Sequence, residues 1–158
     1  IASRAESAAS MKRREVLLRA RVGLIDRAYT NAEEYICSLP EEDYVSFLSH
    51  LLSDAVNSRL DEAAELAEHY GEEADCNFEV IFNSADREKL SERVLGRSSE
   101  LLGKRGKDIY VSVAEETADI RGGLILRYGD IETNCSVKAV ISSLRADTES
   151  EVVKVLFS

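Results

Sequence analysis

The chain has 158 residues, of which 44% are hydrophobic and 32% are charged. This balance is typical of a globular protein, and the length suits one domain, or one small domain with an extension. No apolar run approaches the ~20 residues that a membrane-spanning helix requires. Against 30 Asp and Glu the chain has 20 Lys and Arg, a net charge of -10, which argues against general binding to nucleic acid or to an anionic membrane.

The cysteines and histidines predict neither a disulfide framework nor a zinc site. Cys37, Cys76 and Cys135 are odd in number and widely separated, which suits a reducing cytoplasm. His50 and His69 have no Cys or His at ligand spacing, so four zinc ligands are not evident. The chain begins at Ile1 and its one methionine is Met11, and we therefore expect a fragment of a longer protein.

Residues 1–38 are predicted to form one long helix of the coiled-coil type. They contain no Pro, a single Gly, and many of the strong helix formers Ala, Arg, Glu and Leu. Apolar residues recur at alternating steps of four and three, as in a heptad seam: Leu18, Val22, Ile25, Tyr29, Ala32, Ile36 and Leu39. Leu17 and Leu24 widen this seam. For residues 1–25 we expect a second chain to cover it, and from Tyr29 onward packing on the chain's own globular part is favoured.

Charge also separates this segment from the rest. Residues 1–38 carry seven basic and five acidic residues, a net of +2, whereas residues 39–158 carry 13 basic and 25 acidic residues, a net of -12. The basic run Lys12, Arg13, Arg14, Arg19 and Arg21 is compatible with a solvated helix face, an acidic partner helix or nucleic acid. Nucleic acid is disfavoured because the whole chain is acidic and no aromatic residues interleave.

Residues 39–158 are predicted to form an α+β domain. Ser38-Leu39-Pro40-Glu41 has the residue types of a helix start, with Ser38 as cap and Glu41 closing a capping box. The helix that follows is expected to end at Gly71. Strands are predicted by alternation over 77–83, 109–114 and 123–128, with a fourth over 131–135, and a helix over 85–95 that could reach Leu102. Helices between antiparallel strands indicate a four-stranded, mainly antiparallel sheet packed by helices.

Glycines mark the strongest turn signals in this second segment. Gly129-Asp130 lies between two predicted strands and suits a two-residue type II′ turn, which needs positive φ at its first position. Gly122-Gly123 opens a strand rather than a helix, so it is not a dinucleotide-binding fingerprint. Gly122, Gly123, Gly129 and Asp130 are therefore predicted to be structural.

The final helix is expected to start at a cap provided by Asn134 or Ser136. Its predicted apolar face, expected to pack on the sheet, is Val137, Val140, Ile141, Leu144, Val152, Val155 and Leu156.

No catalytic motif is evident. The acidic stretch from Glu41 to Asp75 lacks the spacing and central Gly of a calcium loop, and a solvated helix face explains it better. Gly103–Lys107 lacks the phosphate-loop pattern, and no Ser lies in GxSxG. We expect no catalytic residues, no metal and no cofactor. A small hydrolase with a nucleophile assembled from distant residues is the alternative of another class.

The residues above resemble the E subunit of V-type and A-type ATPases over nearly the whole chain. In the helical part the matching residues are Ala5 to Leu18, Ala20-Arg21, Leu24-Ile25-Asp26, Glu42-Asp43-Tyr44, Phe47-Leu48 and Leu51-Leu52. In the rest they are Gly122-Gly123-Leu124-Ile125-Leu126, Ile131-Glu132, Ser136 and Val153-Lys154-Val155-Leu156-Phe157. The chain departs from the family pattern at Asn134-Cys135-Ser136, at Val140 and in a longer stretch over 57–72. The long family helix normally begins further upstream, so the resemblance also implies that about the first quarter of the family's usual length is absent.

The resemblance implies a non-catalytic component of a peripheral stalk. Residues 1–38 would be the stalk helix, forming a heterodimer with the G subunit through Leu18, Val22, Ile25 and Tyr29. Residues 39–158 would be a head-docking domain that contacts chiefly the B subunit, with an indirect link to the stator component in the membrane. The chain would be cytoplasmic, with no membrane insertion, and would serve ion transport, proton transport or ATP synthesis by resisting rotor torque. Two further interpretations are the delta subunit of F-type ATP synthase or a flagellar export stator, which share the double-Gly hairpin, and a generic coiled-coil adaptor.

Overall fold

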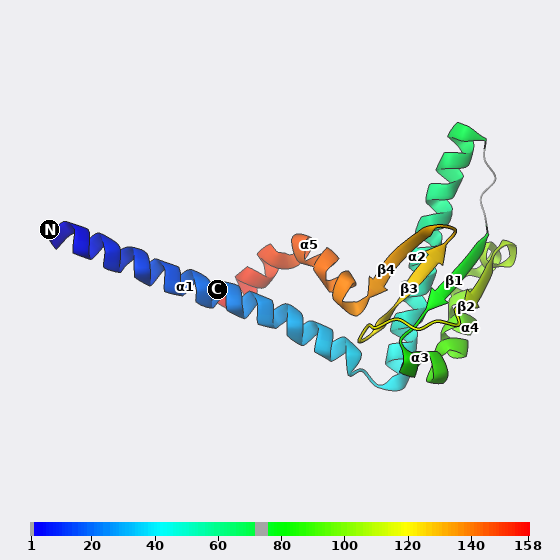
Figure 1. The fold of residues 1–158 in the computed structure, drawn as a ribbon, viewed down its shortest axis with the longest axis horizontal. Helices are drawn as coiled ribbons and strands as arrows, with labels where there is room; N and C mark the ends of the chain where they lie inside the picture. The colour runs from blue at the N-terminus through cyan, green and yellow to red at the C-terminus, as the bar shows by residue number, and fades with distance from the viewer. Residues whose placement is uncertain (1, 72–75) are drawn as a thin grey trace. The chain divides into compact units, whose positions relative to one another are not determined.

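The computed structural model describes residues 2–71 and 76–158. Long helices precede a four-stranded sheet with its own helices, which confirms the predicted α+β class (Figure 1). In chain order the elements are α1 (Ala2–Cys37), α2 (Glu41–Tyr70), β1 (Asn77–Ile81), α3 (Ser84–Lys89), α4 (Ser91–Leu102), the 3-10 helix η1 (Gly103–Asp108), β2 (Tyr110–Val113), β3 (Gly123–Tyr128), β4 (Ile131–Ser136) and α5 (Val137–Phe157).

The contacts within the chain define two compact units. One contains residues 36–140, with the whole sheet and helices α2, α3 and α4. The other is purely helical and joins residues 2–35 of α1 with residues 141–158, most of α5. The division into a stalk helix over 1–38 and a head-docking domain over 39–158 stays a prediction.

The sheet has the strand order β2-β1-β3-β4. β1 pairs with β3 and β3 pairs with β4, both antiparallel, whereas β1 and β2 are parallel, from Asn77 opposite Tyr110 to Val80 opposite Val113. Two of the three pairings are therefore antiparallel, as the predicted mainly antiparallel sheet requires. A parallel pair needs a crossover, and α3, α4 and η1 provide it between β1 and β2.

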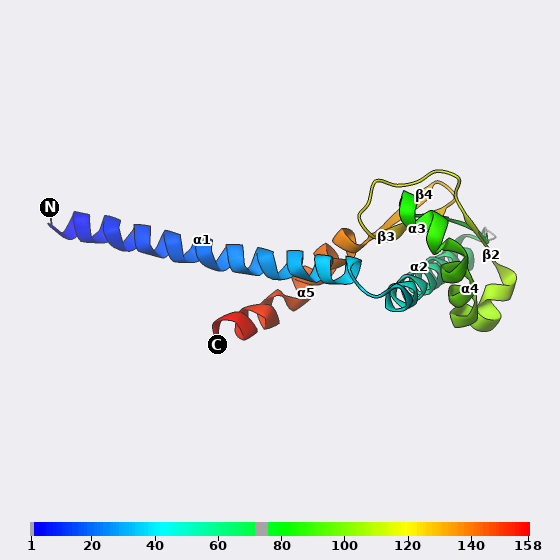
Figure 2. The ribbon, with the colours of Figure 1, turned by 90° about the horizontal axis from the view of Figure 1, so that it is seen from below.

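The core of this unit lies between the sheet and two helices. α2 packs against α4 and β3, and α4 also contacts β2. Alternate residues of the strands point toward these helices, so Phe78, Val80, Leu124 and Leu126 are almost completely buried. Figure 2 shows α2 and α4 on one side of the sheet and the connection between β2 and β3 arching over the other. The buried residues of α2 in this core are Tyr44, Val45, Leu48, Leu52 and Val56.

The ends of α2 confirm one prediction and correct another. The helix stops at Gly71, whose φ of 67° is left-handed and whose N–H donates to the carbonyl of Ala67, as expected of a C-terminal glycine. At the other end Ser38 is not the cap. Pro40 occupies that position without a side-chain hydrogen bond, and Glu41 forms an ion pair with Arg93 instead of closing a capping box.

The single helix predicted after β1 is two helices. Asn83 begins α3, because its side-chain oxygen accepts a hydrogen bond of 2.8 Å from the N–H of Asp86. The backbone of Leu90, with φ of -122°, ends α3 at Lys89 and starts α4 at Ser91. The break turns Leu90 into the core, where it is 5% exposed.

The final helix corrects the predicted apolar face. Ser136 is its cap, because its Oγ accepts a hydrogen bond of 3.2 Å from the N–H of Ala139. Within the predicted face Val137 is buried, and Val140, Ile141 and Val152 are half-buried. Leu144, Val155 and Leu156 are exposed, which packing on the sheet would not allow. Residues 141–158 instead belong to the unit that contains α1.

Candidate partner-binding surface

The first half of α1 exposes an unusual amount of apolar surface. Every residue from 4 to 22 is exposed. Large apolar side chains at 41–71% exposure are Met11, Val16, Leu17, Leu18, Val22 and Leu24. Apolar patches of this kind on a single helix mark sites of protein association. Small residues leave shallow hollows on this surface: Ala8 lines one beside Leu18, and Ala9 lines one beside Leu17. Such hollows suit knobs-into-holes packing by a second helix.

The predicted seam of α1 is split between two environments. Leu18 and Val22 are 55% and 53% exposed, whereas Ile25 is only 8% exposed. Tyr29 is half-buried, and its hydroxyl lies 2.9 Å from Oγ1 of Thr148 in α5. The second half of the seam is therefore covered within the chain, and the first half is open.

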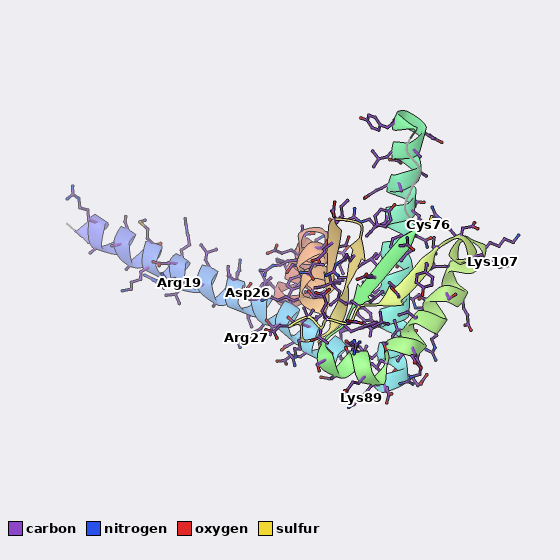
Figure 3. All side chains as sticks on the ribbon, turned by 45° about the vertical axis from the view of Figure 1, so that its right-hand side comes forward. Arg19, Asp26, Arg27, Cys76, Lys89 and Lys107 are labelled. Atoms are coloured by element: carbon purple, nitrogen blue, oxygen red, sulfur yellow. The ribbon has the colours of Figure 1, made fainter. Side chains whose placement is uncertain are left out.

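Three contacts join α5 to α1, two in this covered part and one just before it. Arg145 forms an ion pair of 2.6 Å with Asp26, and its guanidinium lies 5.1 Å from the ring centre of Tyr29. The guanidinium of Arg21 lies 5.3 Å from the ring centre of Phe157, a distance typical of a cation–π contact. The hydrogen bond to Asp26 raises the pKa of Arg145, so this arginine stays charged. Figure 3 shows the side chains around Arg19 standing clear and Asp26 close to α5.

Sequence reasoning does not reveal these contacts. Asp26 and Arg145 are 119 residues apart, and no spacing rule connects residues at that distance. The one sequence feature that points to the end of α5 is the pair Leu156-Phe157, which belongs to the family resemblance. The sequence does not indicate which residues this pair contacts.

The basic run is arranged around the open apolar residues. Of its members, Arg19 forms an i, i+4 ion pair of 2.6 Å with Glu15 and Arg21 stacks on Phe157. Lys12, Arg13 and Arg14 form no ion pair with any described residue. The surface therefore combines exposed aliphatic side chains with uncompensated positive charge.

The double glycine lies where a side chain would have almost no room, at both of its positions. A Cβ on Gly122 would lie 2.9 Å from Sγ of Cys37 and 3.0 Å from the Tyr44 hydroxyl. Gly123 has φ of 91°, and a Cβ there would lie 2.4 Å from the carbonyl oxygen of Cys135. The N–H of Gly123 donates to the Tyr44 hydroxyl at 3.1 Å. Only glycine permits this close backbone approach.

A partly buried chain of hydrogen bonds extends from the double glycine to α3. The Tyr44 hydroxyl donates to Oδ2 of Asp86 at 2.7 Å, while Asn83 donates to the carbonyl of Arg121 at 3.1 Å. Burial raises the pKa of Tyr44 and of Asp86, because both charged forms lose hydration there. The chain of bonds holds α2, α3 and the start of β3 together, which is a structural role that sequence reasoning does not identify.

A tight turn joins β3 and β4. Gly129 has φ of 57°, and Asp130 has negative φ, which fits a type II′ turn and excludes type I′. Tyr128 pairs with Ile131 across it, so Gly129-Asp130 is the complete loop.

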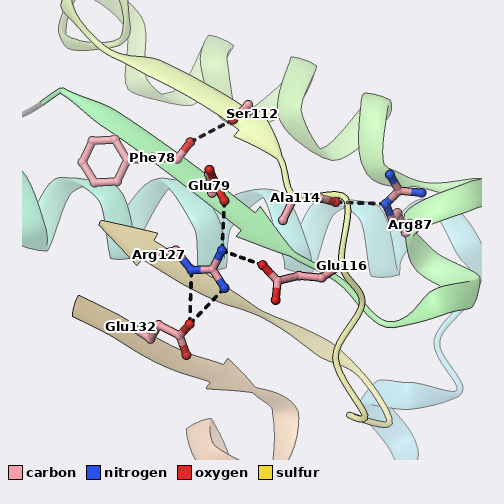
Figure 4. A network of polar contacts seen from close by, with 8 residues as sticks. All are labelled: Phe78, Glu79, Arg87, Ser112, Ala114, Glu116, Arg127 and Glu132. Carbon is pink, nitrogen blue, oxygen red and sulfur yellow. Dashed lines mark hydrogen bonds and ion pairs between the residues drawn. The ribbon is translucent and has the colours of Figure 1, made fainter. Parts of the chain in front are cut away.

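The sheet face away from α2 carries an ion network centred on Arg127 (Figure 4). Arg127 on β3 contacts Glu79 on β1, Glu132 on β4 and Glu116 in the β2–β3 connection, at 3.1, 3.1 and 2.6 Å. The hydrogen bonds to Glu116 and Glu132 raise the pKa of Arg127, and the bond from Arg127 lowers the pKa of Glu116. Three carboxylates around one permanent cation fasten the connection to the strands.

Neither a metal centre nor a bilayer-crossing segment is evident in the described residues. Across residues 2–71 and 76–158, no group of three or more His, Cys, Asp or Glu side chains is placed to hold a metal ion. No helix within these ranges combines the length and apolarity needed to cross a membrane.

Comparisons with known proteins give one consistent result. No family model matches the chain. Over 157 residues it is 31% identical to the E subunit of the V-type proton ATPase of Clostridium botulinum (strain Loch Maree / Type A3), a match that covers 99% of this chain and 70% of that protein. It is 32% identical over 120 residues to the E subunit of the V-type ATP synthase of Acetivibrio thermocellus, covering 76% of this chain. It is 29% identical over 140 residues to the E subunit of the V-type proton ATPase of Thermoanaerobacter pseudethanolicus, covering 89% of this chain.

These matches extend over both units of the structure, and in the Clostridium botulinum case over almost all of it. The chain spans 52% and 62% of the length of the Acetivibrio and Thermoanaerobacter relatives. The chain belongs to the E subunit family of V-type ATPases.

Proposed function

We propose that the chain is the non-catalytic peripheral stalk component of a V-type or A-type rotary ATPase. In this role α1 pairs with a helix of the G subunit, and residues 39–158 dock on the catalytic head, chiefly on the B subunit. The link to the stator component in the membrane is indirect, and the chain lies on the cytoplasmic side. Tethering the head in this way opposes rotor torque and so couples ATP turnover to ion movement.

The observation that carries the proposal is the open apolar surface of α1. A helix whose residues 4–22 are all exposed gains little from its own chain, and an isolated helix of this length is marginal in water. Pairing through Leu18 and Val22 would bury their exposed area and stabilise the helix. Membership of the E subunit family supports the assignment of the G subunit as the partner.

A pair of substitutions tests the pairing. Leu18→Asp with Val22→Asp is expected to weaken capture of the G subunit at least about 100-fold, because two charges buried in a helix seam cost several kcal/mol each unless neutralised. Ile25 is left unchanged because it is buried within the chain, so that the variant tests the interface alone. The measurement is a pull-down with the purified G subunit, with circular dichroism to show that the fold is kept.

The matched control is Leu66→Asp with Tyr70→Asp, an exposed apolar pair at the same spacing on α2. It should leave the pairing unchanged. In the assembled complex the α1 variant should lower ion pumping while ATP hydrolysis by the head persists. Normal capture by the α1 variant would mean that this surface is not the interface.

A further inference from the structure

The last turn of α5 holds apolar side chains beside the open part of α1. Phe157 stacks on Arg21, and next to it Leu156 and Val155 are 41% and 80% exposed. Arg21 follows Leu17 by four residues and precedes Leu24 by three, so the three side chains lie on one face of α1. The contact with Phe157 therefore places the end of α5 at the edge of the Leu17–Leu24 face.

The rest of α5 covers the neighbouring face of α1, which contains Ile25 and Tyr29. Ile25 is buried, and Asp26 and Tyr29 are bonded to Arg145 and Thr148. A second helix following α1 on the Ile25 side would have to break these contacts. The Leu17–Leu24 face needs no such rearrangement, because Leu17 is 63% and Leu24 is 41% exposed.

The charge around this face selects the kind of partner. Residues 4–21 contain six basic residues and two acidic ones, in a chain whose net charge is -10. Two copies of the chain paired through this segment would place the two basic segments together. An acidic helix from another chain would instead gain favourable electrostatics on approach and in the complex.

We propose that Leu17, Leu24 and the last turn of α5, with Leu156 as its main contact, form one composite groove for an amphipathic helix with acidic residues beside its apolar stripe. Phe157, stacked on Arg21, positions that turn. The proposal rests on the proposed function: a helix that covers Leu18 and Val22 would continue toward Leu24 rather than toward the buried Ile25, and would so reach the last turn of α5. It also explains the Leu156-Phe157 pair, which the core of the sheet unit does not use.

Two designed helical peptides provide the probe. Both carry Leu and Ile in a heptad stripe, and they differ only in the flanking positions, which are Glu in one and Lys in the other. Binding of each peptide to the full 158-residue chain is measured by fluorescence anisotropy at low and high salt. We expect the Glu peptide to bind at least 10-fold more tightly than the Lys peptide, with the difference shrinking at high salt.

Variants locate the groove. Leu156→Asp and Leu17→Asp should each weaken binding of the Glu peptide at least 10-fold. The control is Tyr35→Asp, which alters an exposed side chain about three turns beyond Leu24 on the same helix and should have little effect. A photoreactive benzoylphenylalanine at position 156 should cross-link to the peptide, whereas one at the exposed Ser142 should not. This second measurement does not depend on a destabilising charge.

The outcomes separate this proposal from the previous one. If Leu18→Asp with Val22→Asp abolishes pairing with the G subunit while Leu156→Asp leaves binding of the G subunit and of the Glu peptide unchanged, the stalk function stands and the composite groove is wrong. Equal binding of the two peptides, no binding of the Glu peptide, or self-association of the chain through this face would also overturn the groove. If both variants, Leu18→Asp with Val22→Asp and Leu156→Asp, still paired normally with the G subunit, the proposed stalk function and the composite groove would both be wrong.

Discussion

At the scale of single residues, glycine positions give the sharpest contrast. Gly123→Ala places a Cβ against the Cys135 carbonyl at a backbone φ of 91°. We expect this change to lower the free energy of unfolding by about 2–5 kcal/mol, from backbone strain and overpacking together. Gly96→Ala is the matched control, because its Cβ meets nothing within 4 Å in helix α4. It should stabilise the chain by about 0.5–1 kcal/mol. Urea unfolding of both variants measures the difference, and equal effects would contradict the close approach described at Gly123.

Asp86 gives the chain a defined dependence on pH. Burial raises the pKa of Asp86 from its ordinary 3.8, so the folded state holds this proton more tightly than the unfolded state does. The stability that Asp86 contributes is therefore fully present below pH 3.8 and is lost as the pH rises through the folded-state pKa. Asp86→Asn stays neutral while still offering an acceptor to Tyr44. Its stability relative to the wild type should rise through this range of pH and then level off.

The companion variant Tyr44→Phe removes the donor that lowers the pKa of Asp86. In this variant the pKa of Asp86 should be higher, so the protein should lose the stability contributed by Asp86 at a higher pH than the wild type does. Unfolding in urea between about pH 3.5 and 7 measures all three proteins, a range that begins below the ordinary pKa of an Asp carboxyl. A constant difference between Asp86→Asn and the wild type over this range would show that Asp86 has the same pKa folded and unfolded.

At the scale of helices and strands, the sequence predicts those features that depend only on residues close together in the chain. The alternation of Phe78 and Val80 predicts β1, Gly71 predicts the end of α2, and Gly129-Asp130 predicts the hairpin turn, because each depends on backbone geometry within a few residues. The start of α2 is harder to predict because Ser38, Pro40 and Glu41 all have cap-like chemistry, and Arg93, far along the chain, decides where Glu41 points.

Contacts between distant elements cannot be predicted in this way. The apolar pattern of α5 predicts a covered face but does not identify what would cover it. Residues 141–158 join α1 instead of the sheet, and part of the predicted face is exposed. The parallel pairing of β1 with β2 likewise depends on the crossover through α4. In the candidate surface, heptad spacing alone predicts Leu18 and Val22 as partner-facing residues. The contact of Arg21 with Phe157 can be found only from the structure.

At the scale of the whole molecule, the two units differ in how they are stabilised. Residues 36–140 enclose a core in which Leu48, Leu52, Phe78 and Leu126 are almost completely buried. The first half of α1 has no such core, since residues 4–22 are all exposed. Opening of a backbone hydrogen bond is therefore expected to cost far less free energy in residues 4–20 than in the sheet.

Amide hydrogen exchange on the isolated chain measures this difference directly. Amides of residues 4–20 should exchange quickly, because a helix of this length without tertiary contacts is only marginally stable, whereas amides of α2 and β3 should be protected close to the level set by global unfolding. Residues 25–29 should be intermediate, because Asp26 and Tyr29 contact α5. Adding the G subunit should slow exchange in residues 4–24 and leave β3 unchanged, and Leu18→Asp with Val22→Asp should remove that protection. Strong protection of residues 4–20 in a chain shown to be monomeric would contradict the proposal that α1 depends on a partner helix.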